Sequence, residues 1–272
     1  MKRVTPQETW PESWKYSYRY DLQEIYGEIT HRGYAYAYQT RREATLRLAS
    51  EVLRQGARIL DVAAAQGNFS MALAELGFDV TWNDLREDLA EYVQLKHERG
   101  RIQYVPGNVF DTEFDTIFDA VLLTEIIEHV AHPDRLLERT ASLVRPGGYV
   151  IMTTPNGKYF RNRLPKFSEC TDPAIYESVQ FRPDADGHIF LLHPEEITPL
   201  AARAGLEVDA LTLFTNPLTQ GHLKTEPLLR VLPPGVVTTF EQVTRLMPRG
   251  VRERCLVQMG VRFKRPPLQA AA

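Results

Sequence analysis

Short apolar runs alternate with amphipathic segments along most of this chain. The apolar runs predict seven strands, over residues 58–62, 79–83, 102–105, 118–123, 149–153, 206–214 and 254–263. Segments with a helical period predict helices over residues 38–54, 68–76, 87–97, 133–144 and 194–204. Strands that alternate with helices favour an α/β domain built on a parallel sheet, which binds ligands at the carboxyl ends of its strands.

Three segments fall outside this alternation. Residues 1–37 are rich in aromatic side chains, and seven of the twelve tyrosines lie between residues 16 and 38. We expect this segment to be a lid or cap that excludes water from a site, a helix pair that covers a sheet edge, or a mixture of the two. Residues 38–272 are expected to form one domain with two long insertions, at about 155–187 and 215–250, which suggests loops with a function.

The turn after the first strand carries the strongest chemical signal. Residues 58–69 have the sequence R-I-L-D-V-A-A-A-Q-G-N-F, in which small residues follow a strand and lead into a helix. Such a turn lets the backbone approach a ligand at the helix N-terminus. Asp61 would repel the pyrophosphate of a dinucleotide, but it would attract the ammonium and sulfonium of S-adenosylmethionine. Asp84, 23 residues later, can accept hydrogen bonds from both ribose hydroxyls, so the pair favours a methyl donor over NAD.

With three further segments, these motifs resemble the class I S-adenosylmethionine-dependent methyltransferases. The pieces, in chain order, are I-L-D-V-A-A-A-Q-G (59–67), V-T-W-N-D-L (80–85), G-N-V-F (107–110), F-D-A-V-L-L-T-E-I-I-E-H-V (118–130) and V-R-P-G-G-Y-V-I-M-T-T-P-N (144–156). The resemblance implies a Rossmann-like, seven-stranded, mostly parallel sheet with helices on both faces and its last strand antiparallel. The donor-binding residues that it implies are Asp61, Ala63, Ala65, Gly67, Asp84, Leu85, Asn108, Val109 and Thr124.

The first motif departs from the family pattern, which usually has three alternate glycines. Here the three positions are Ala63, Ala65 and Gly67. Alanine adds a methyl group and disfavours positive φ. Either the backbone of this turn avoids left-handed conformations or the donor site is degenerate, and we expect the first. At Asn108 the family often has an acid that faces the adenine amino group; the amide oxygen could accept the same hydrogen bond, or the amide nitrogen could serve a ring nitrogen.

An acidic and histidine-containing cluster follows the fourth strand. On a helix, Glu125, Glu128 and His129 would share one face, because their spacing is i, i+3, i+4. The E-x-x-E-H spacing resembles that of the ubiquinone-pathway O-methyltransferases and the small-RNA 3′-terminal 2′-O-methyltransferases, which use a metal. His188, in a later His-x-Phe segment similar to that of the RNA enzymes, is the candidate fourth ligand. Such ligands suit Mg, Mn, Fe or Zn.

A metal-free alternative stands beside this one. Glu-His followed shortly by Pro is widespread in methyltransferases that use no metal, and there His129 or His188 would act as a general base. The candidate catalytic residues are therefore Glu125, His129 and His188 under one alternative or the other. His193, directly before Pro194, is expected to start a helix rather than to bind a ligand.

Composition and charge limit the classes of partner that we expect this protein to bind. The net charge of −3 over 272 residues argues against RNA or an acidic membrane, and no apolar segment approaches the ~20 residues of a membrane span. The two cysteines are far apart and no signal-peptide pattern is seen, so we expect reduced thiols in a cytoplasmic protein. Lys158, Arg161, Arg163 and Lys166 could hold a phosphate or carboxylate, or could simply lie on a solvated loop.

Together these features predict O-methylation of a small hydroxylated metabolite, a sugar or a glycan intermediate, with or without a metal. One alternative is 2′-O-methylation of an RNA 3′ end. Another is a scaffold that binds S-adenosylmethionine without catalysis, which the two alanines of the first motif would suit. The oligomeric state is not predicted.

Overall fold

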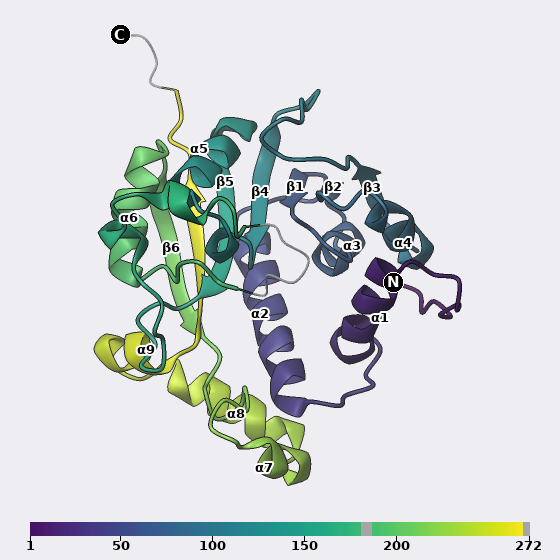
Figure 1. The fold of residues 1–272 in the computed structure, drawn as a ribbon, viewed down its shortest axis with the longest axis vertical. Helices are drawn as coiled ribbons and strands as arrows, with labels where there is room; N and C mark the ends of the chain where they lie inside the picture. Colours follow the sequence, from purple (N-terminus) through teal and green to yellow (C-terminus); the bar gives the residue numbers. More distant parts are fainter. Residues whose placement is uncertain (181–186, 269–272) are drawn as a thin grey trace.

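The computed structural model describes residues 1–180 and 187–268 and contains one seven-stranded sheet (Figure 1). The strand order is β3-β2-β1-β4-β5-β7-β6. The strands are β1 Arg58–Val62, β2 Asp79–Asn83, β3 Arg101–Tyr104, β4 Phe118–Thr124, β5 Val144–Pro155, β6 Glu207–Phe214 and β7 Gln258–Lys264. β7 runs antiparallel to both of its neighbours, β5 and β6, and the other neighbouring strands pair in parallel. The predicted fold, with its last strand antiparallel, is confirmed.

The central strands β1, β4 and β5 are largely apolar because both faces of the sheet are buried. Alternate residues of β1 point to opposite faces, so Leu60 and Val62 join one core and Ile59 joins the other. The α-helices are α1 Glu12–Glu24, α2 Arg32–Ser50, α3 Asn68–Glu75, α4 Leu89–Lys96, α5 Pro133–Leu143, α6 Pro194–Arg203, α7 Glu226–Val231, α8 Pro234–Thr244 and α9 Arg249–Cys255. Residues of α5 and α6 pack on the first face, and residues of α2 and α3 on the second.

Several predicted element boundaries are wrong, the largest differences being at the ends of α2 and at the starts of β5 and β7. Helix α2 begins at Arg32 rather than at residue 38, so it runs across the boundary predicted between residues 37 and 38. The last strand begins at Gln258 rather than at residue 254, because α9 continues to Cys255. The insertion 215–250 contains α7, α8 and the start of α9, and residues 181–186 of the other insertion lie outside the described residues. His193 does precede α6, and its backbone N–H bonds to the Glu196 side chain at 2.8 Å, as in a capping box.

A buried polar network joins the N-terminal segment to the sheet domain. Asp21 of α1 accepts hydrogen bonds from Lys96 (2.6 Å), Tyr92 (2.6 Å) and Asn68 (2.8 Å), which lie on α4 and α3. The Lys96 and Asp21 side chains are both fully buried. Because an unpaired buried charge is costly, this network couples the position of α1 to the start of α3, where the candidate donor turn ends.

The aromatic side chains of the first segment divide between two environments. Trp10 and Trp14 are buried against Tyr92 of α4, with ring centroids 5.7 Å apart in each pair. Tyr16 and Tyr38 instead line the cavity described below. Part of this segment therefore packs on the sheet domain and part borders a cavity, and its role as a lid stays a prediction.

No helix in the described part of the chain is long and apolar enough to cross a membrane. Cys170 and Cys255 are free and form no disulfide.

Candidate functional site

A cavity of about 530 Å³ lies at the carboxyl ends of β1, β2 and β4. This volume is within the range of sites for small ligands and cofactors. Seven of the nine predicted donor-binding residues line it, namely Ala63, Ala65, Asp84, Leu85, Asn108, Val109 and Thr124. Glu125 and His129 also line it. We call this space the first cavity.

The turn between β1 and α3 adopts left-handed conformations despite its alanines. The φ angles of Ala63, Ala65 and Gly67 are 53°, 48° and 71°. The expectation that this backbone would avoid positive φ is therefore wrong. Each alanine carries strain on the order of 1–2 kcal/mol, and long-range hydrogen bonds oppose it: Ala65 N–H donates to Asp84 Oδ2 (2.8 Å), and Trp82 Nε1 donates to the Ala65 carbonyl (3.0 Å).

Asp61 and Gly67 are the two predicted donor-binding residues that do not line the first cavity. The Asp61 side chain is fully buried; Ser70 Oγ donates to its Oδ2 at 2.5 Å, and its Oδ1 has no hydrogen-bond partner. Burial raises the pKa of Asp61 to about 7. Gly67 precedes α3, and a Cβ there would lie 2.6 Å from a Val93 methyl. Asp61 and Gly67 thus shape the turn from beneath rather than form its surface.

Asp84 and Asn108 present polar groups at the cavity wall. Asp84 is 4% exposed; besides Ala65, it accepts hydrogen bonds from the Arg86 backbone (2.9 Å) and the Arg86 Nε (3.0 Å). The Asn108 Oδ1 accepts from Phe110 N–H at 3.1 Å. That bond leaves the amide nitrogen of Asn108 as the group suited to a ring nitrogen.

Sequence reasoning missed two charged residues of the first cavity, Glu24 and Arg41. Arg41, on α2, donates to Glu125 Oε2 at 2.9 Å, and both side chains are largely buried. Glu24, at the end of α1, accepts from Tyr34 (2.5 Å), and burial raises its pKa above the usual range. No local pattern identifies either residue, because α1 and α2 reach the cavity only through tertiary packing.

The E-x-x-E-H segment does not form the predicted helix. Glu125 has a φ of 51°, which ends β4 in a left-handed residue, and only Ile127–His129 forms a short 3₁₀-helix. Glu125 pairs with Arg41 and lies outside the group of possible metal ligands found among the described residues, whereas the prediction included it. A left-handed, non-glycine residue at a cavity wall is a common feature of functional sites.

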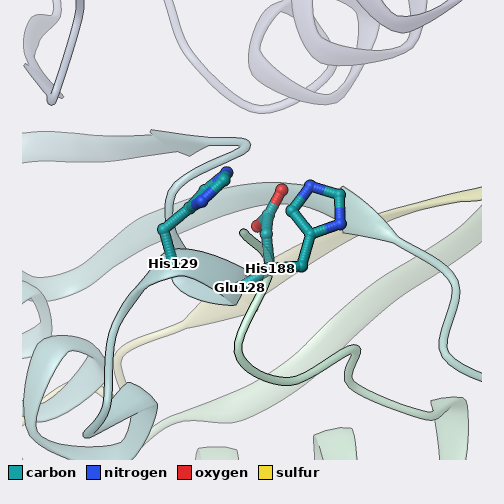
Figure 2. Close-up of side chains that lie close together, drawn as sticks. All are labelled: Glu128, His129 and His188. Atoms are coloured by element: carbon teal, nitrogen blue, oxygen red, sulfur yellow. The ribbon is translucent and has the colours of Figure 1, made fainter. Parts of the chain in front are cut away.

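Glu128, His129 and His188 do come together (Figure 2). One ligand atom from each lies within 4.8 Å of the others, and we call this group the His-Glu cluster. The Ile189 N–H donates to the Glu128 carbonyl (2.7 Å), which brings His188 beside a segment 60 residues away in sequence. Glu128 is fully buried; its Oε2 accepts from Thr154 (3.0 Å), whereas its Oε1 has no partner. Burial and the charge of Glu125 raise the pKa of Glu128 well above its usual value.

A second cavity, of about 510 Å³, adjoins the first. Arg41 and Glu125 line both cavities, His129 lines the first, and His188 lines the second. The His-Glu cluster therefore has one histidine at the wall of each cavity. Two molecules bound in the two cavities would approach one another beside this cluster.

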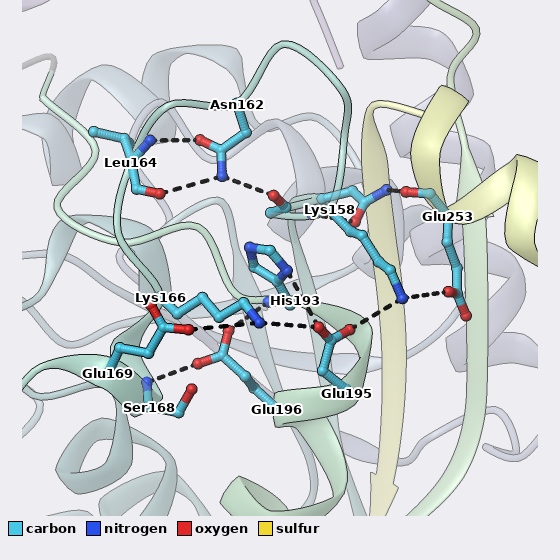
Figure 3. Close-up of polar contacts among 12 residues, drawn as sticks. Lys158, Asn162, Leu164, Lys166, Ser168, Glu169, His193, Glu195, Glu196 and Glu253 are labelled. Atoms are coloured by element: carbon cyan, nitrogen blue, oxygen red, sulfur yellow. Dashed lines mark hydrogen bonds and ion pairs between the residues drawn. The ribbon is translucent and has the colours of Figure 1, made fainter.

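The cations of the loop after β5 divide between ion pairs and the second cavity. Lys158 pairs with Glu253 at 2.8 Å, and Lys158 and Lys166 both pair with Glu195, at 3.5 and 3.3 Å (Figure 3). Arg161 and Arg163 line the second cavity instead.

Comparisons with known proteins agree with this geometry. A family model described as a methyltransferase domain matches residues 31–211. A ubiquinone biosynthesis O-methyltransferase of Bordetella avium (strain 197N) is 34% identical over 172 residues, which is 61% of this chain and 69% of the relative. Another from Xanthomonas campestris pv. campestris (strain B100) is 37% identical over 113 residues, 40% of this chain and 47% of the relative.

The fold is shared with solved methyltransferases. The magnesium protoporphyrin IX methyltransferase of Synechocystis PCC 6803, solved with bound SAH (S-adenosylhomocysteine), superposes with a TM-score of 0.57 at 11% identity, covering 92% of this chain and 94% of that one. The family model covers more than half of the chain. This protein therefore belongs to the methyltransferase domain family and is an S-adenosylmethionine-dependent methyltransferase.

Proposed function

We propose that this enzyme methylates a hydroxyl oxygen of a small acceptor, with the methyl donor in the first cavity and the acceptor in the second. The observation that carries the proposal is that the two cavities share Arg41 and Glu125 as walls beside the His-Glu cluster. A transfer between two bound molecules needs such a meeting point, because proximity and alignment supply much of the rate when the sulfonium is already reactive. The O-methyltransferase names of the relatives support oxygen as the acceptor atom.

Several groups suit the donor. Asp84 offers carboxylate oxygens for the ribose hydroxyls, and Asn108 offers an amide nitrogen for the adenine ring. Arg41 and Glu24 offer one positive and one negative charge for the zwitterionic amino-acid end. The backbone of the Ala63–Ala65 turn allows close approach. In this arrangement Asp61 supports the turn from beneath through Ser70 rather than by direct contact with the donor.

The acceptor hydroxyl must lose a proton as the new bond forms. His129 and His188 lie at the cavity walls where that proton would be removed, and their rings are 4.9 Å apart between centroids. A positioned general base typically contributes ~10²–10⁴-fold in rate. Thr154 holds one oxygen of Glu128, which directs the carboxylate towards the two rings.

The His-Glu cluster also fits a divalent metal. It offers one oxygen and two nitrogen ligands, and the buried, unpartnered Oε1 of Glu128 is the kind of atom that a cation satisfies. Glu128, His129 and His188 would hold Mg, Mn, Fe or Zn, which would lower the pKa of a bound hydroxyl. Glu125, which pairs with Arg41, would stay outside this ligand set.

Metal binding can be measured without knowing the acceptor. We expect EDTA-stripped protein to take up Mn²⁺ or Zn²⁺ in calorimetric titration, and Glu128→Gln and His188→Ala to weaken this uptake at least tenfold. Glu125→Gln is the matched control, because it changes the neighbouring acid outside the cluster, and it should retain uptake. Equal uptake by the wild type and all three variants, or full turnover in excess EDTA, would contradict a metal at this cluster and leave His129 or His188 as the general base.

The acceptor class is tested by turnover. The enzyme is assayed on small catechols, sugars and glycan intermediates, and on a short RNA that tests 2′-O-methylation. We expect it to methylate a small hydroxylated compound and not the RNA. Methylation of the RNA alone would overturn the proposed acceptor class.

A further inference from the structure

We propose that the second cavity selects an acceptor with an anionic group, a carboxylate or a phosphate, which Arg161 and Arg163 bind while the hydroxyl faces His188. The inference rests on the proposed function, because it names the class of acceptor that would occupy the second cavity. It begins from an imbalance of charge in the loop after β5.

The four cations of this loop differ in whether an acidic side chain pairs with them. Lys158 and Lys166 are neutralised by Glu195 and Glu253 (Figure 3). Among the residues that the structure describes, no ion pair links an acid to Arg161 or Arg163, although both line the second cavity. Their recorded hydrogen bonds go to backbone carbonyls: Arg161 donates to that of His222, and Arg163 to that of Asn162. Several guanidinium N–H groups of each arginine therefore remain to be satisfied by a ligand or by water.

The charged groups around the second cavity favour an anion. Arg41 is balanced by Glu125, which leaves Arg161 and Arg163 in excess. His222 also lines the cavity; burial and the positive charge of Arg161 lower its pKa, which favours the neutral ring, and a neutral ring does not offset the two arginines. The whole chain has a net charge of −3, so this local excess of positive charge is not an average property of the surface. Guanidinium groups bind carboxylate and phosphate oxygens through paired hydrogen bonds.

The loop that carries the two arginines is held in place. The Asn162 side chain donates to the Gly157 carbonyl (2.7 Å) and accepts from Leu164 N–H (2.9 Å; Figure 3). Phe160 N–H bonds to the Arg254 carbonyl at 2.9 Å. At Gly157, a Cβ would lie only 2.1 Å from the Leu191 carbonyl oxygen, so the loop packs tightly there. Preorganised binding groups lose less entropy when a ligand binds.

Two unpartnered polar atoms suit the rest of such an acceptor. The Tyr159 hydroxyl and the Gln220 Oε1 belong to residues that line the second cavity, and neither atom has a hydrogen-bond partner among the described residues. Tyr159 is 7% exposed, so its hydroxyl lies largely out of reach of bulk water. One atom can donate and the other can accept, which matches a compound with hydroxyl groups besides the anionic group.

The experiment compares anionic and neutral probes on the intact enzyme saturated with S-adenosylhomocysteine. The probes are 3,4-dihydroxybenzoate against catechol for a carboxylate, and glucose 6-phosphate against glucose for a phosphate. We expect one anionic probe to bind at least tenfold more tightly than its neutral partner. The pair with the larger difference shows whether the site prefers a carboxylate or a phosphate. Arg161→Gln and Arg163→Gln should each weaken that probe about tenfold to a hundredfold, as for hydrogen bonds to charged groups, and leave the neutral partner unchanged.

Lys158→Gln and Lys166→Gln are the matched controls, because they remove cations of the same loop that are already paired. The inference is overturned if neither anionic probe binds, if anionic and neutral probes bind alike, or if the lysine variants weaken binding as much as the arginine variants. An unchanged affinity for S-adenosylhomocysteine verifies that each variant is folded. If the wild-type enzyme binds S-adenosylhomocysteine but shows no preference for anionic probes, only this inference fails. If the wild-type enzyme does not bind S-adenosylhomocysteine, the proposed function is contradicted.

Discussion

Replacing either left-handed alanine of the donor turn by glycine should stabilise the folded protein. Ala63 and Ala65 have φ angles of 53° and 48°, where alanine costs about 1–2 kcal/mol that glycine does not. Glycine loses ~0.4–1 kcal/mol more chain entropy on folding, so the net gain is about 0.5–1 kcal/mol per site. The Ala63 methyl also packs against the core, and its loss offsets part of that gain. Ala65→Gly is therefore the cleaner test.

We expect Ala65→Gly to raise the free energy of unfolding by about 0.5–1 kcal/mol, which corresponds to ~1–4 °C in Tm for a chain of this size. Ala63→Gly should raise it less. Urea unfolding of the ligand-free protein measures the change. Ala64→Gly is the matched control, because Ala64 lies in the same turn and does not have a positive φ; it should be neutral or destabilising. If Ala65→Gly were as destabilising as Ala64→Gly, the strain inferred for this turn would be refuted.

Three further predictions follow from buried charges and the donor site. The pKa of Asp61 rises from its usual 3.8 to about 7 on folding, so the folded state binds a proton more tightly and its stability falls as pH rises between those values. Urea unfolding of Asp61→Asn should thus show stability relative to wild type rising by about 3 kcal/mol from pH 4 to pH 7; a difference that does not change with pH would contradict the inferred pKa. Lys96→Met leaves Asp21 buried without its opposite charge and should cost about 3–5 kcal/mol. The Lys96→Met, Asp21→Asn double variant should regain much of the lost stability. In the single variant, amide hydrogen exchange in α1 should become faster. A single variant as stable as wild type would show that the ion pair is dispensable. Asp84→Ala should weaken S-adenosylmethionine binding at least tenfold in calorimetry, because it removes the ribose acceptors and the hydrogen bond that holds Ala65; unchanged affinity would place the donor elsewhere.

The sheet was predictable because its signal is local. β1 is a largely apolar run, and β2 alternates Val80 and Trp82 with polar residues; the bounds of both strands, Arg58–Val62 and Asp79–Asn83, agree with the prediction residue for residue. The start of α2 was missed because His31, which precedes it, makes no side-chain capping bond, and the aromatic residues that follow are weak helix formers.

The chemistry of the site was predictable only where the motif itself fixes the geometry. Asp84 directly follows β2 and lines the first cavity because parallel strands end at the same edge of a sheet. The conformation of Ala65 was predicted wrongly because a hydrogen bond to Asp84, 19 residues away, outweighs the local preference of alanine. The partner of Glu125 is Arg41, 84 residues earlier, and no local pattern indicates that pair. Glu125 was expected on a helix, but its left-handed φ ends the strand before one can form.

A structure of the enzyme with S-adenosylhomocysteine, with the sulfur located by its anomalous scattering, tests the central claim most directly. The claim is that the donor occupies the first cavity with its reactive end towards the junction with the second. The predicted result is ribose hydroxyls on Asp84 and the sulfur on the side of Glu125 and His129. A ligand bound in the second cavity, or a sulfur turned away from the His-Glu cluster, would contradict it.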